Sequence, residues 1–261
     1  MTGISAVGSA CVAGLAFAFS GSAAQAISIA YVKNGGNDAL TCADVANACQ
    51  TLGGALTKVD EGGEIYIVDT SNYEFVAINK SISIIALQPQ GHIHVFGGAI
   101  AVTINADTND VIHLAGLDID GGTGTNGIGI RILQAGRVDV RDCVIRNFKG
   151  DPGTGLSVET ATNVQVFVSN CAFSGNDNGI IVDPTAGAAA VMLDNVQVEK
   201  NSAIGIGSDG ATSFVFLNDS IVTLNGTGLS ATNSGKIVSY RNNAISGNTA
   251  SDAPTLSIPL R

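Results

Sequence analysis

Tryptophan is absent from this chain of 261 residues, and Tyr (4), Pro (5) and charged residues (13%) are scarce. Few aromatic rings leave few surfaces on which sugar rings could stack. Acidic residues outnumber Lys and Arg by 22 to 12, giving a net charge of −10. Nucleic-acid binding requires basic patches, so we expect no nucleic-acid partner. The sequence also contains no phosphate-binding Gly-rich loop leading into a helix and no cofactor motif, so we expect no cofactor.

Gly (33 residues), Val, Ile, Thr and Asn dominate instead, a composition typical of short strands and tight turns. A repeat becomes visible when six equivalent positions are aligned, which are Leu117, Cys143, Cys171, Val196, Ser220 and Asn243. The steps between them are 26, 28, 25, 24 and 23 residues. A period in the twenties indicates a solenoid, and the chain shows no linker that would divide it into two domains.

The segment "VFVSNCAFSGNDNGIIV" shows how one repeat is built. Val166 and Val168 alternate with Phe167, a break at Asn170 resets the phase, and Cys171 begins a second short strand. The segment "NGIIV" is a third strand, so each repeat closes one coil of three strands. Successive coils are predicted to stack in parallel around a continuous apolar core.

Asn and Asp recur at two bends of this coil, where stacked side chains can bond to the turn backbone and to one another. The outer ladder precedes the second strand and contains Asp142, Asn170, Asn195, Asp219 and Asn242, with Gly116 at its start. The inner ladder follows the second strand and contains Asn176, Asn201, Asn225 and Asn248. Glycines that we expect to need a positive φ mark the other turn at Gly127, Gly155, Gly179, Gly205 and Gly228.

The phrases "GLDIDGGTGTNGIGI", "CVIRNF" and "SYRNNAISGN" resemble the pectate-lyase-like right-handed parallel β-helix proteins, in particular small exported bacterial members. The resemblance runs from about Tyr31 to the C-terminal "SIPLR". It implies an all-β, right-handed parallel β-helix with three strands per rung and about seven rungs. It implies less about activity, since this scaffold hosts lyases, hydrolases, esterases, adhesins and proteins without known chemistry.

A single β-helix domain is expected over 27–261, with an N-terminal cap at 27–62, rungs at 63–250 and a C-terminal cap at 251–261. In the N-terminal cap, Leu52, Ala55, Leu56 and Val59 lie on one helical face. Proteins of the resembling family use such a helix to close the open end of the coil, where unpaired strand edges would otherwise be exposed.

Residues 1–26 combine an apolar run with small residues ending in Ala24-Gln25-Ala26, the pattern of a cleaved signal peptide. A short buried helix or a single membrane anchor is the alternative. We predict export to the periplasm, the cell surface or the medium, and no membrane span in the mature chain. Cys42 and Cys49 are then expected to form a disulfide, whereas Cys143 and Cys171 stack in successive coils as buried free thiols.

The acidic and basic residues with the most catalytic promise are Asp118, Asp120, Asp139, Arg141 and Arg146, all at predicted outward positions of neighbouring rungs. In a polysaccharide lyase, the three carboxylates would hold calcium and Arg141 or Arg146 would take a proton next to the uronate carboxylate. Alternatively, Asp120 and Arg146 form an ordinary surface ion pair one rung apart. The Gly-His-Gly and Arg-x-Lys motifs of polygalacturonase-like hydrolases are absent.

The segment "GHIHVF" suggests a second chemistry, because His92 and His94 point to the same face of one strand. If Ile93 stacks on Leu117, His94 lies beside Asp118, and the three side chains could ligate zinc or another divalent ion. The alternative is a pair of solvated strand histidines.

The outward position of the first strand becomes apolar in three successive units, at Phe167, Met192 and Phe216. Stacked at the strand spacing, these side chains would form an exposed patch suited to self-association or to docking of a partner. Alternatively, the Pro184–Ala190 segment or the C-terminal tail covers them.

Two functions follow from these observations. The first is an exported, non-catalytic β-helix that acts as a scaffold or binds a polysaccharide or protein partner. The second is a polysaccharide lyase, or a related carbohydrate-active enzyme, that acts on an acidic polysaccharide with calcium through the Asp/Arg cluster. The motifs do not decide whether the chain is an enzyme.

Overall fold

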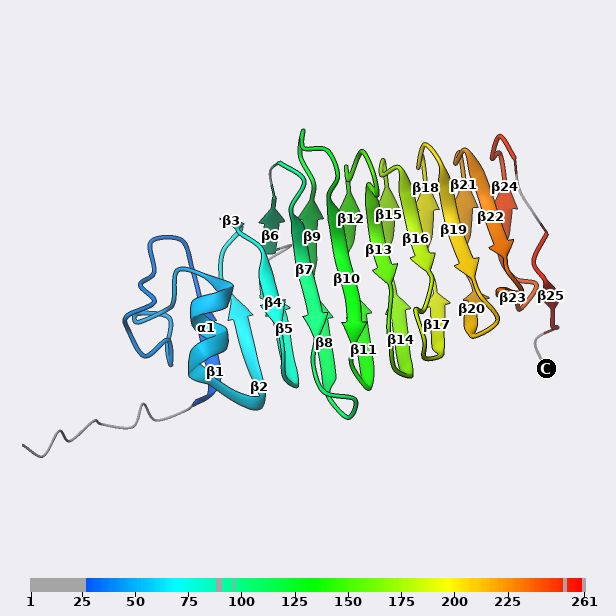
Figure 1. The fold of residues 1–261 in the computed structure, drawn as a ribbon. Coiled ribbons are helices and arrows are strands. Elements are labelled where there is room, and N and C mark those ends of the chain that lie inside the picture. Colours follow the sequence, from blue (N-terminus) through cyan, green and yellow to red (C-terminus); the bar gives the residue numbers. More distant parts are fainter. Residues whose placement is uncertain (1–26, 88–90, 96, 251–252, 260–261) are drawn as a thin grey trace, which may run out of the picture.

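The computed structural model describes residues 27–87, 91–95, 97–250 and 253–259. Three parallel sheets wind into one solenoid, and the coils follow one another along its axis in chain order (Figure 1). The predicted all-β, right-handed parallel β-helix with three strands per coil is confirmed. The predicted signal peptide, residues 1–26, lies outside the described residues.

The first sheet has ten strands, each paired in parallel with the equivalent strand of the next coil. From the N-terminal end they are β1 (Ile27–Val32), β2 (Val59–Ile67), β5 (Ile82–Ala86), β8 (Val111–Ala115), β11 (Arg137–Arg141), β14 (Val164–Ser169), β17 (Ala189–Asp194), β20 (Ser213–Asn218), β23 (Lys236–Ser239) and β25 (Leu256–Ser257).

The other two sheets have eight and seven strands. The eight-stranded sheet contains β3 (Asn72–Tyr73), β6 (Gly91–His94), β9 (Leu117–Asp120), β12 (Val144–Arg146), β15 (Ala172–Ser174), β18 (Gln197–Glu199), β21 (Ile221–Thr223) and β24 (Ala244–Ser246). The seven-stranded sheet contains β4 (Val76–Ile78), β7 (Ile100–Asn105), β10 (Ile128–Gln134), β13 (Thr154–Val158), β16 (Asn178–Val182), β19 (Ile204–Asp209) and β22 (Thr227–Thr232).

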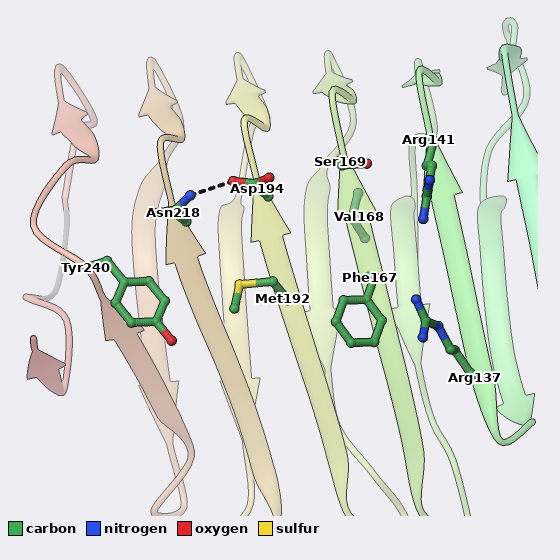
Figure 2. A pocket seen from close by; sticks show the side chains of 9 residues that line it. All are labelled: Arg137, Arg141, Phe167, Val168, Ser169, Met192, Asp194, Asn218 and Tyr240. Atoms are coloured by element: carbon green, nitrogen blue, oxygen red, sulfur yellow. Dashed lines mark hydrogen bonds between the residues drawn. The ribbon is translucent and has the colours of Figure 1, made fainter. Parts of the chain in front are cut away.

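The core follows from strict alternation along these strands. One inward column of the ten-stranded sheet is aliphatic in five successive coils and is at most 1% exposed, at Val138, Val166, Val191, Val215 and Ile237. The neighbouring residues point outward, as Figure 2 shows for Phe167 on β14 and Met192 on β17. Inward columns from all three sheets merge into one apolar cluster along the solenoid.

The predicted cap helix is α1 (Leu52–Lys58). It begins after Thr51, whose side-chain oxygen accepts a hydrogen bond from the Gly54 N–H. Leu52, Ala55 and Leu56 are buried and join the core, whereas Val59 already belongs to β2. The helix contacts β1, β2 and β4 and lies at the N-terminal end of the solenoid (Figure 1).

The predicted disulfide between Cys42 and Cys49 is confirmed, with the two Cα atoms 5.0 Å apart. Cys143 and Cys171 are free and buried. Burial raises the pKa of the Cys143 thiol, which favours its neutral form.

At the bend between the ten-stranded and eight-stranded sheets, side chains of the next coil accept hydrogen bonds from backbone N–H groups. The two thiols are among these acceptors. The Leu117 N–H donates to the Cys143 sulfur and the Cys143 N–H donates to the Cys171 sulfur, both at 3.4 Å. Further along, the Val196 N–H donates to Ser220 Oγ at 3.1 Å, and the Ser220 N–H donates to Asn243 Oδ1 at 2.8 Å. Thiol, hydroxyl and amide groups therefore serve one structural purpose, which is to satisfy a buried N–H of the preceding coil.

The outer ladder lies at the same bend, where Asp142, Asn170, Asn195 and Asp219 have φ values between 47° and 54°. Asn and Asp tolerate this left-handed conformation better than most residues. Asn170 donates to Asp142 at 3.1 Å, and Asn195 donates to Asn170 at 2.9 Å, but these side chains are solvent-exposed.

The predicted outer ladder is wrong in its last members. The next bonds lie in the neighbouring column of strand-end residues, where Asn218 donates to Asp194, and Asn242 donates to Asn218, so Asn242 does not stack on Asp219. Strand pairing aligns Leu217 with Ser239 and Ile221 with Ala244, which places three residues in the earlier bend and four in the last one. The additional residue moves Asn242 out of register, and Arg241 adopts the positive φ instead.

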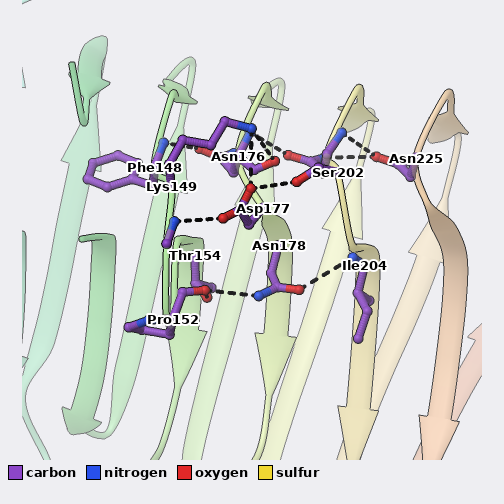
Figure 3. A network of polar contacts seen from close by, with 12 residues as sticks. Phe148, Lys149, Pro152, Thr154, Asn176, Asp177, Asn178, Ser202, Ile204 and Asn225 are labelled. Carbon is purple, nitrogen blue, oxygen red and sulfur yellow. Dashed lines mark hydrogen bonds and ion pairs between the residues drawn. The ribbon is translucent and has the colours of Figure 1, made fainter. Parts of the chain in front are cut away.

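The inner ladder carries the stronger network (Figure 3). Asn176, Asn201 and Asn225 are at most 2% exposed. The N–H groups of Phe148, Asn176, Asn201 and Asn225 each donate to the Oδ1 atom of the Asn one coil further along, at 2.9–3.0 Å. The side-chain NH2 groups of the four Asn residues donate to carbonyl oxygens of the eight-stranded sheet. Each amide thus satisfies backbone groups on two coils.

The expected role of the turn glycines is wrong. Gly155, Gly179 and Gly205 do not adopt a positive φ, and the residue in register with them is Gly129 rather than Gly127. A Cβ at Gly179 would lie 2.5 Å from the Gly205 oxygen. Close approach between coils, rather than an unusual backbone conformation, therefore requires glycine here.

We predict that the inner ladder contributes more to the free energy of unfolding than the outer ladder does. Asn201→Leu should lower the free energy of unfolding by about 2–4 kcal/mol, because it leaves the buried Asn176 N–H and the Phe173 carbonyl without their partner. Asn195→Leu should cost roughly 1–2 kcal/mol through its left-handed backbone, and Asn195→Gly should be nearly neutral. Urea unfolding measures all three variants, and equal losses for Asn201→Leu and Asn195→Leu would contradict this assignment.

Thiol counting tests the cysteine assignment and the processing of residues 1–26 together. In denaturant without reductant, we expect two thiols, Cys143 and Cys171, if residues 1–26 are removed, and three if Cys11 is retained. Reduction should add two thiols from Cys42 and Cys49 in either case. No increase on reduction would contradict the disulfide in the isolated protein.

Candidate functional site

The five residues predicted to form one acidic and basic cluster do not come together. Asp118 and Asp120 on β9 and Arg146 on β12 lie on the eight-stranded sheet. Asp139 and Arg141 lie on β11 of the ten-stranded sheet. The predicted single cluster is therefore wrong, because the bend between the two sheets turns the two groups toward different faces of the solenoid.

On the eight-stranded sheet, Arg146 occupies the space between the two carboxylates. Its Nε donates to Asp118 Oδ1 at 3.0 Å, its Nη2 to Asp118 Oδ2 at 2.8 Å, and its Nη1 lies 2.8 Å from Asp120 Oδ2. The hydrogen bonds to Asp118 raise the pKa of Arg146 above its usual value. Arg146 is thus a paired cation, a state opposite to that of a general base.

Asp120 has further partners that stabilise its charge. Burial alone would raise the pKa of Asp120, but hydrogen bonds from the Gly122 N–H at 2.8 Å and Asn147 Nδ2 at 3.0 Å, together with Arg146, lower this pKa below its usual value. The carboxylate is therefore held ionised by neighbours from its own and the next coil.

The predicted histidine register is wrong by two residues. Ile93 pairs with Ile119 rather than with Leu117, so His94 lies opposite Asp120 and His92 lies opposite Asp118. His92 Nε2 is 3.7 Å from Asp118 Oδ2, and the two imidazole rings stack with centroids 5.6 Å apart.

These side chains do not fit the metals considered from the sequence. Across the described ranges, no three or more His, Cys, Asp and Glu side chains are arranged to hold a metal ion. Asp118 and Asp120 already bind Arg146, and Asp139 lies on another sheet, so the three carboxylates do not form an oxygen cage for calcium.

Asp139 belongs to a separate cluster on the ten-stranded sheet. Its side chain is only 1% exposed and accepts hydrogen bonds from Arg137 Nε, at 3.0 Å to Oδ1 and 3.2 Å to Oδ2. His113 Nδ1 lies 2.9 Å from Asp139 Oδ2. The sequence reading did not identify His113, although it occupies the position equivalent to Asp139 in the preceding coil.

A pocket of about 410 Å³ lies on the same sheet, next to this cluster (Figure 2). We call it the sheet-face pocket; its lining residues are Arg137, Arg141, Phe167, Val168, Ser169, Met192, Asp194, Asn218 and Tyr240. It crosses the strands from β11 to the residue after β23, so it spans five coils. The guanidinium carbon of Arg137 lies 4.5 Å from the centre of the Phe167 ring, within the range of a cation–π contact.

Two members of the predicted apolar stripe, Phe167 and Met192, line this pocket and are half-buried. Phe216 pairs with Met192 on the next strand and is also half-buried, but it does not line the pocket. The Pro184–Ala190 segment bonds instead to the preceding turn, where Ala188 N donates to Asn163 Oδ1. In the C-terminal tail, β25 extends the sheet beside β23.

The polar wall of the pocket was not predicted as a unit. Arg141, Ser169, Asp194 and Asn218 are the last residues of successive strands, and Tyr240 directly follows β23, the next strand of the sheet. The signal in the sequence is a polar residue two places after each member of the apolar stripe, and Arg141 holds the same position after Asp139 in the preceding coil. Of these polar residues, only Arg141 is identified from the sequence, and as a candidate base.

Comparison with known proteins identifies the family. The sequence profile described as "Right handed beta helix region" matches residues 100–255, more than half of the chain, and the protein therefore belongs to the right-handed β-helix family. A crystal structure of Escherichia coli YbhC is similar, with a TM-score of 0.60 over 87% of this chain and 74% of that chain. Its sequence identity of 13% supports the fold alone. Comparison with curated protein sequences gave no match.

We predict that the Asp120 network makes stability dependent on acid pH. A carboxyl group whose pKa is lowered by folding contributes stability above its unfolded pKa of about 4, and this contribution is lost as pH falls through the lower folded pKa. Asp120→Asn should therefore lose less stability than the wild type between pH 7 and pH 3 in urea unfolding. Asp60→Asn, a change at an exposed strand position, serves as the control and should behave like the wild type.

Proposed function

We propose that this protein is an exported, non-catalytic β-helix that binds a ligand or partner through the outer face of its ten-stranded sheet. One contrast carries the proposal. Four of the five residues suggested for lyase chemistry are held in ion pairs, Asp118 and Asp120 with Arg146 and Asp139 with Arg137, whereas the sheet-face pocket combines a half-buried apolar floor with polar groups at its edge. Mostly apolar concave sites with a few convergent polar groups are typical of binding sites.

Export is supported by two observations. The first 26 residues have the pattern of a signal peptide, and the Cys42–Cys49 disulfide is of the kind that persists in oxidising compartments. No helix among the described residues is long and apolar enough to cross a membrane. The periplasm, the cell surface and the medium are all consistent with the proposal.

The lyase alternative depends on a free base next to a calcium site. Arg146 is held by Asp118 and Asp120, and Arg137 is held by Asp139. Arg141, the other base considered, lies on the same strand as Asp139 rather than beside Asp118 and Asp120. The geometry therefore favours binding over proton abstraction.

We predict no turnover of acidic polysaccharides. Purified protein incubated with polygalacturonate or alginate, with and without calcium, should produce no more ultraviolet absorbance from unsaturated uronates than heat-denatured protein does. Arg146→Gln should give the same baseline. Turnover by the wild type that disappears in Arg146→Gln would contradict the proposed function and support the lyase alternative.

A further inference from the structure

Arg141 is distinctive among the arginines of the three sheets. Arg131, Arg137 and Arg146 each pair with a carboxylate one coil away or on the same strand. The guanidinium group of Arg141 has no hydrogen bond or ion pair with any residue in the part of the chain that the structure describes, and it lines the sheet-face pocket (Figure 2). In a protein of net charge −10, this cation is left for a group from outside the chain.

The surrounding charges reinforce a preference for an anion at this end of the pocket. Arg137, Asp139 and Arg141 all point outward from β11, so two guanidinium groups flank one buried carboxylate. Asp139 interacts with Arg137 and also with His113, which leaves the charge of Arg141 uncompensated. A planar guanidinium group matches the geometry of a carboxylate, which it can bind through two parallel hydrogen bonds.

The floor of the pocket selects an apolar body next to that anion. The Arg137 guanidinium group lies over the Phe167 ring, and Met192 follows Phe167 one strand further along. A polarisable thioether beside an aromatic ring accommodates aromatic and aliphatic groups of varied shape. A volume of about 410 Å³ is within the range of small-molecule sites.

The far wall limits the number of negative charges that a ligand can carry. Asn218 Nδ2 donates to Asp194 Oδ1 at 2.6 Å, so a carboxylate stands two coils away from Arg141 in the same row. A second anionic group of the ligand placed there would be repelled, and the net charge of the protein opposes polyanions in general. A ligand with a single carboxylate at the Arg141 end meets neither obstacle.

We propose that the sheet-face pocket binds a small amphipathic carboxylate, an aromatic or aliphatic body with one carboxylate group. The carboxylate is bound by Arg141, and the body lies on Phe167 and Met192. This inference rests on the proposed binding function and deepens it, because it names the class of ligand.

The chain contains an intrinsic probe for this site. It has two methionines, Met1 and Met192, so methyl-labelled methionine reports on the pocket floor with almost no overlap. We expect 3-phenylpropionate to shift the Met192 methyl signal with a dissociation constant on the order of 1 mM or lower. Its neutral amide, 3-phenylpropionamide, and acetate, which lacks the body, should bind at least about five-fold more weakly.

Matched variants separate the role of Arg141 from a general loss of charge. Arg141→Gln should weaken 3-phenylpropionate binding about five-fold or more and leave binding of the amide unchanged. Lys200→Gln removes one positive charge after β18 of the eight-stranded sheet and should leave both affinities unchanged. Thermal melts confirm that both variants are folded. Equal binding of carboxylate and amide, or an unchanged affinity in Arg141→Gln, would overturn the inference.

Additional ligands and a sedimentation measurement distinguish failure of this inference from failure of the proposed function. If oligogalacturonate or an acidic peptide shifts Met192 while 3-phenylpropionate does not, the pocket is still a binding site but the ligand class is wrong. Sedimentation of the wild type and of Phe167→Ser at high concentration tests whether a second copy of the chain occupies the pocket. If the wild type dimerises and this variant does not, the pocket is an interface and the inference is overturned. Uronate turnover contradicts the proposed function itself.

Discussion

In-register parallel pairing between successive coils is the constraint on which the rest of this structure depends. Each strand of the three sheets bonds to the equivalent strand of the next coil, about 4.8 Å away. Each residue is therefore packed against the equivalent residue of the next coil, and equivalent positions form columns along the solenoid. Aliphatic columns such as Val138–Val166–Val191 form the core, and the column of Gly155, Gly179 and Gly205 lets neighbouring backbones approach closely.

The bends are where this arrangement would otherwise leave backbone groups unpaired. Strand pairing is interrupted there, and side chains of the next coil replace the missing acceptors. Cys143, Ser220 and Asn201 differ in chemistry, yet each accepts an N–H from the preceding coil. This explains why buried cysteines at one bend and buried asparagines at the other perform the same task, and it assigns the two thiols a structural role.

The sequence predicted the fold and the direction of many side chains, but it predicted the grouping of the polar residues poorly. Phe167 and Met192 were placed outward because strand alternation is a local property. Asp118 and Asp139 were assigned to one cluster, although a bend separates their strands and places them on different sheets. The sequence places His94 beside Asp118, but the structure pairs Ile93 with Ile119 and therefore His94 with Asp120. This register depends on the loops between coils, and the lengths of these loops vary.

The amino-acid sequence by itself therefore determined the repeat, the inward and outward positions within each strand, the capping helix and the Cys42–Cys49 pair, since each depends on backbone periodicity or on residues close in the chain. The sequence already offered an Asp120–Arg146 ion pair as an alternative, but only the tertiary structure decided that Arg146 binds Asp118 as well and that Arg141 and Tyr240 line one pocket. The physical reason is that lateral register between coils is set by hydrogen-bond pairing across 23–28 residues of chain in the coils from Leu117 to Asn243, and one additional residue in a bend moves the side chains of that bend relative to their neighbours.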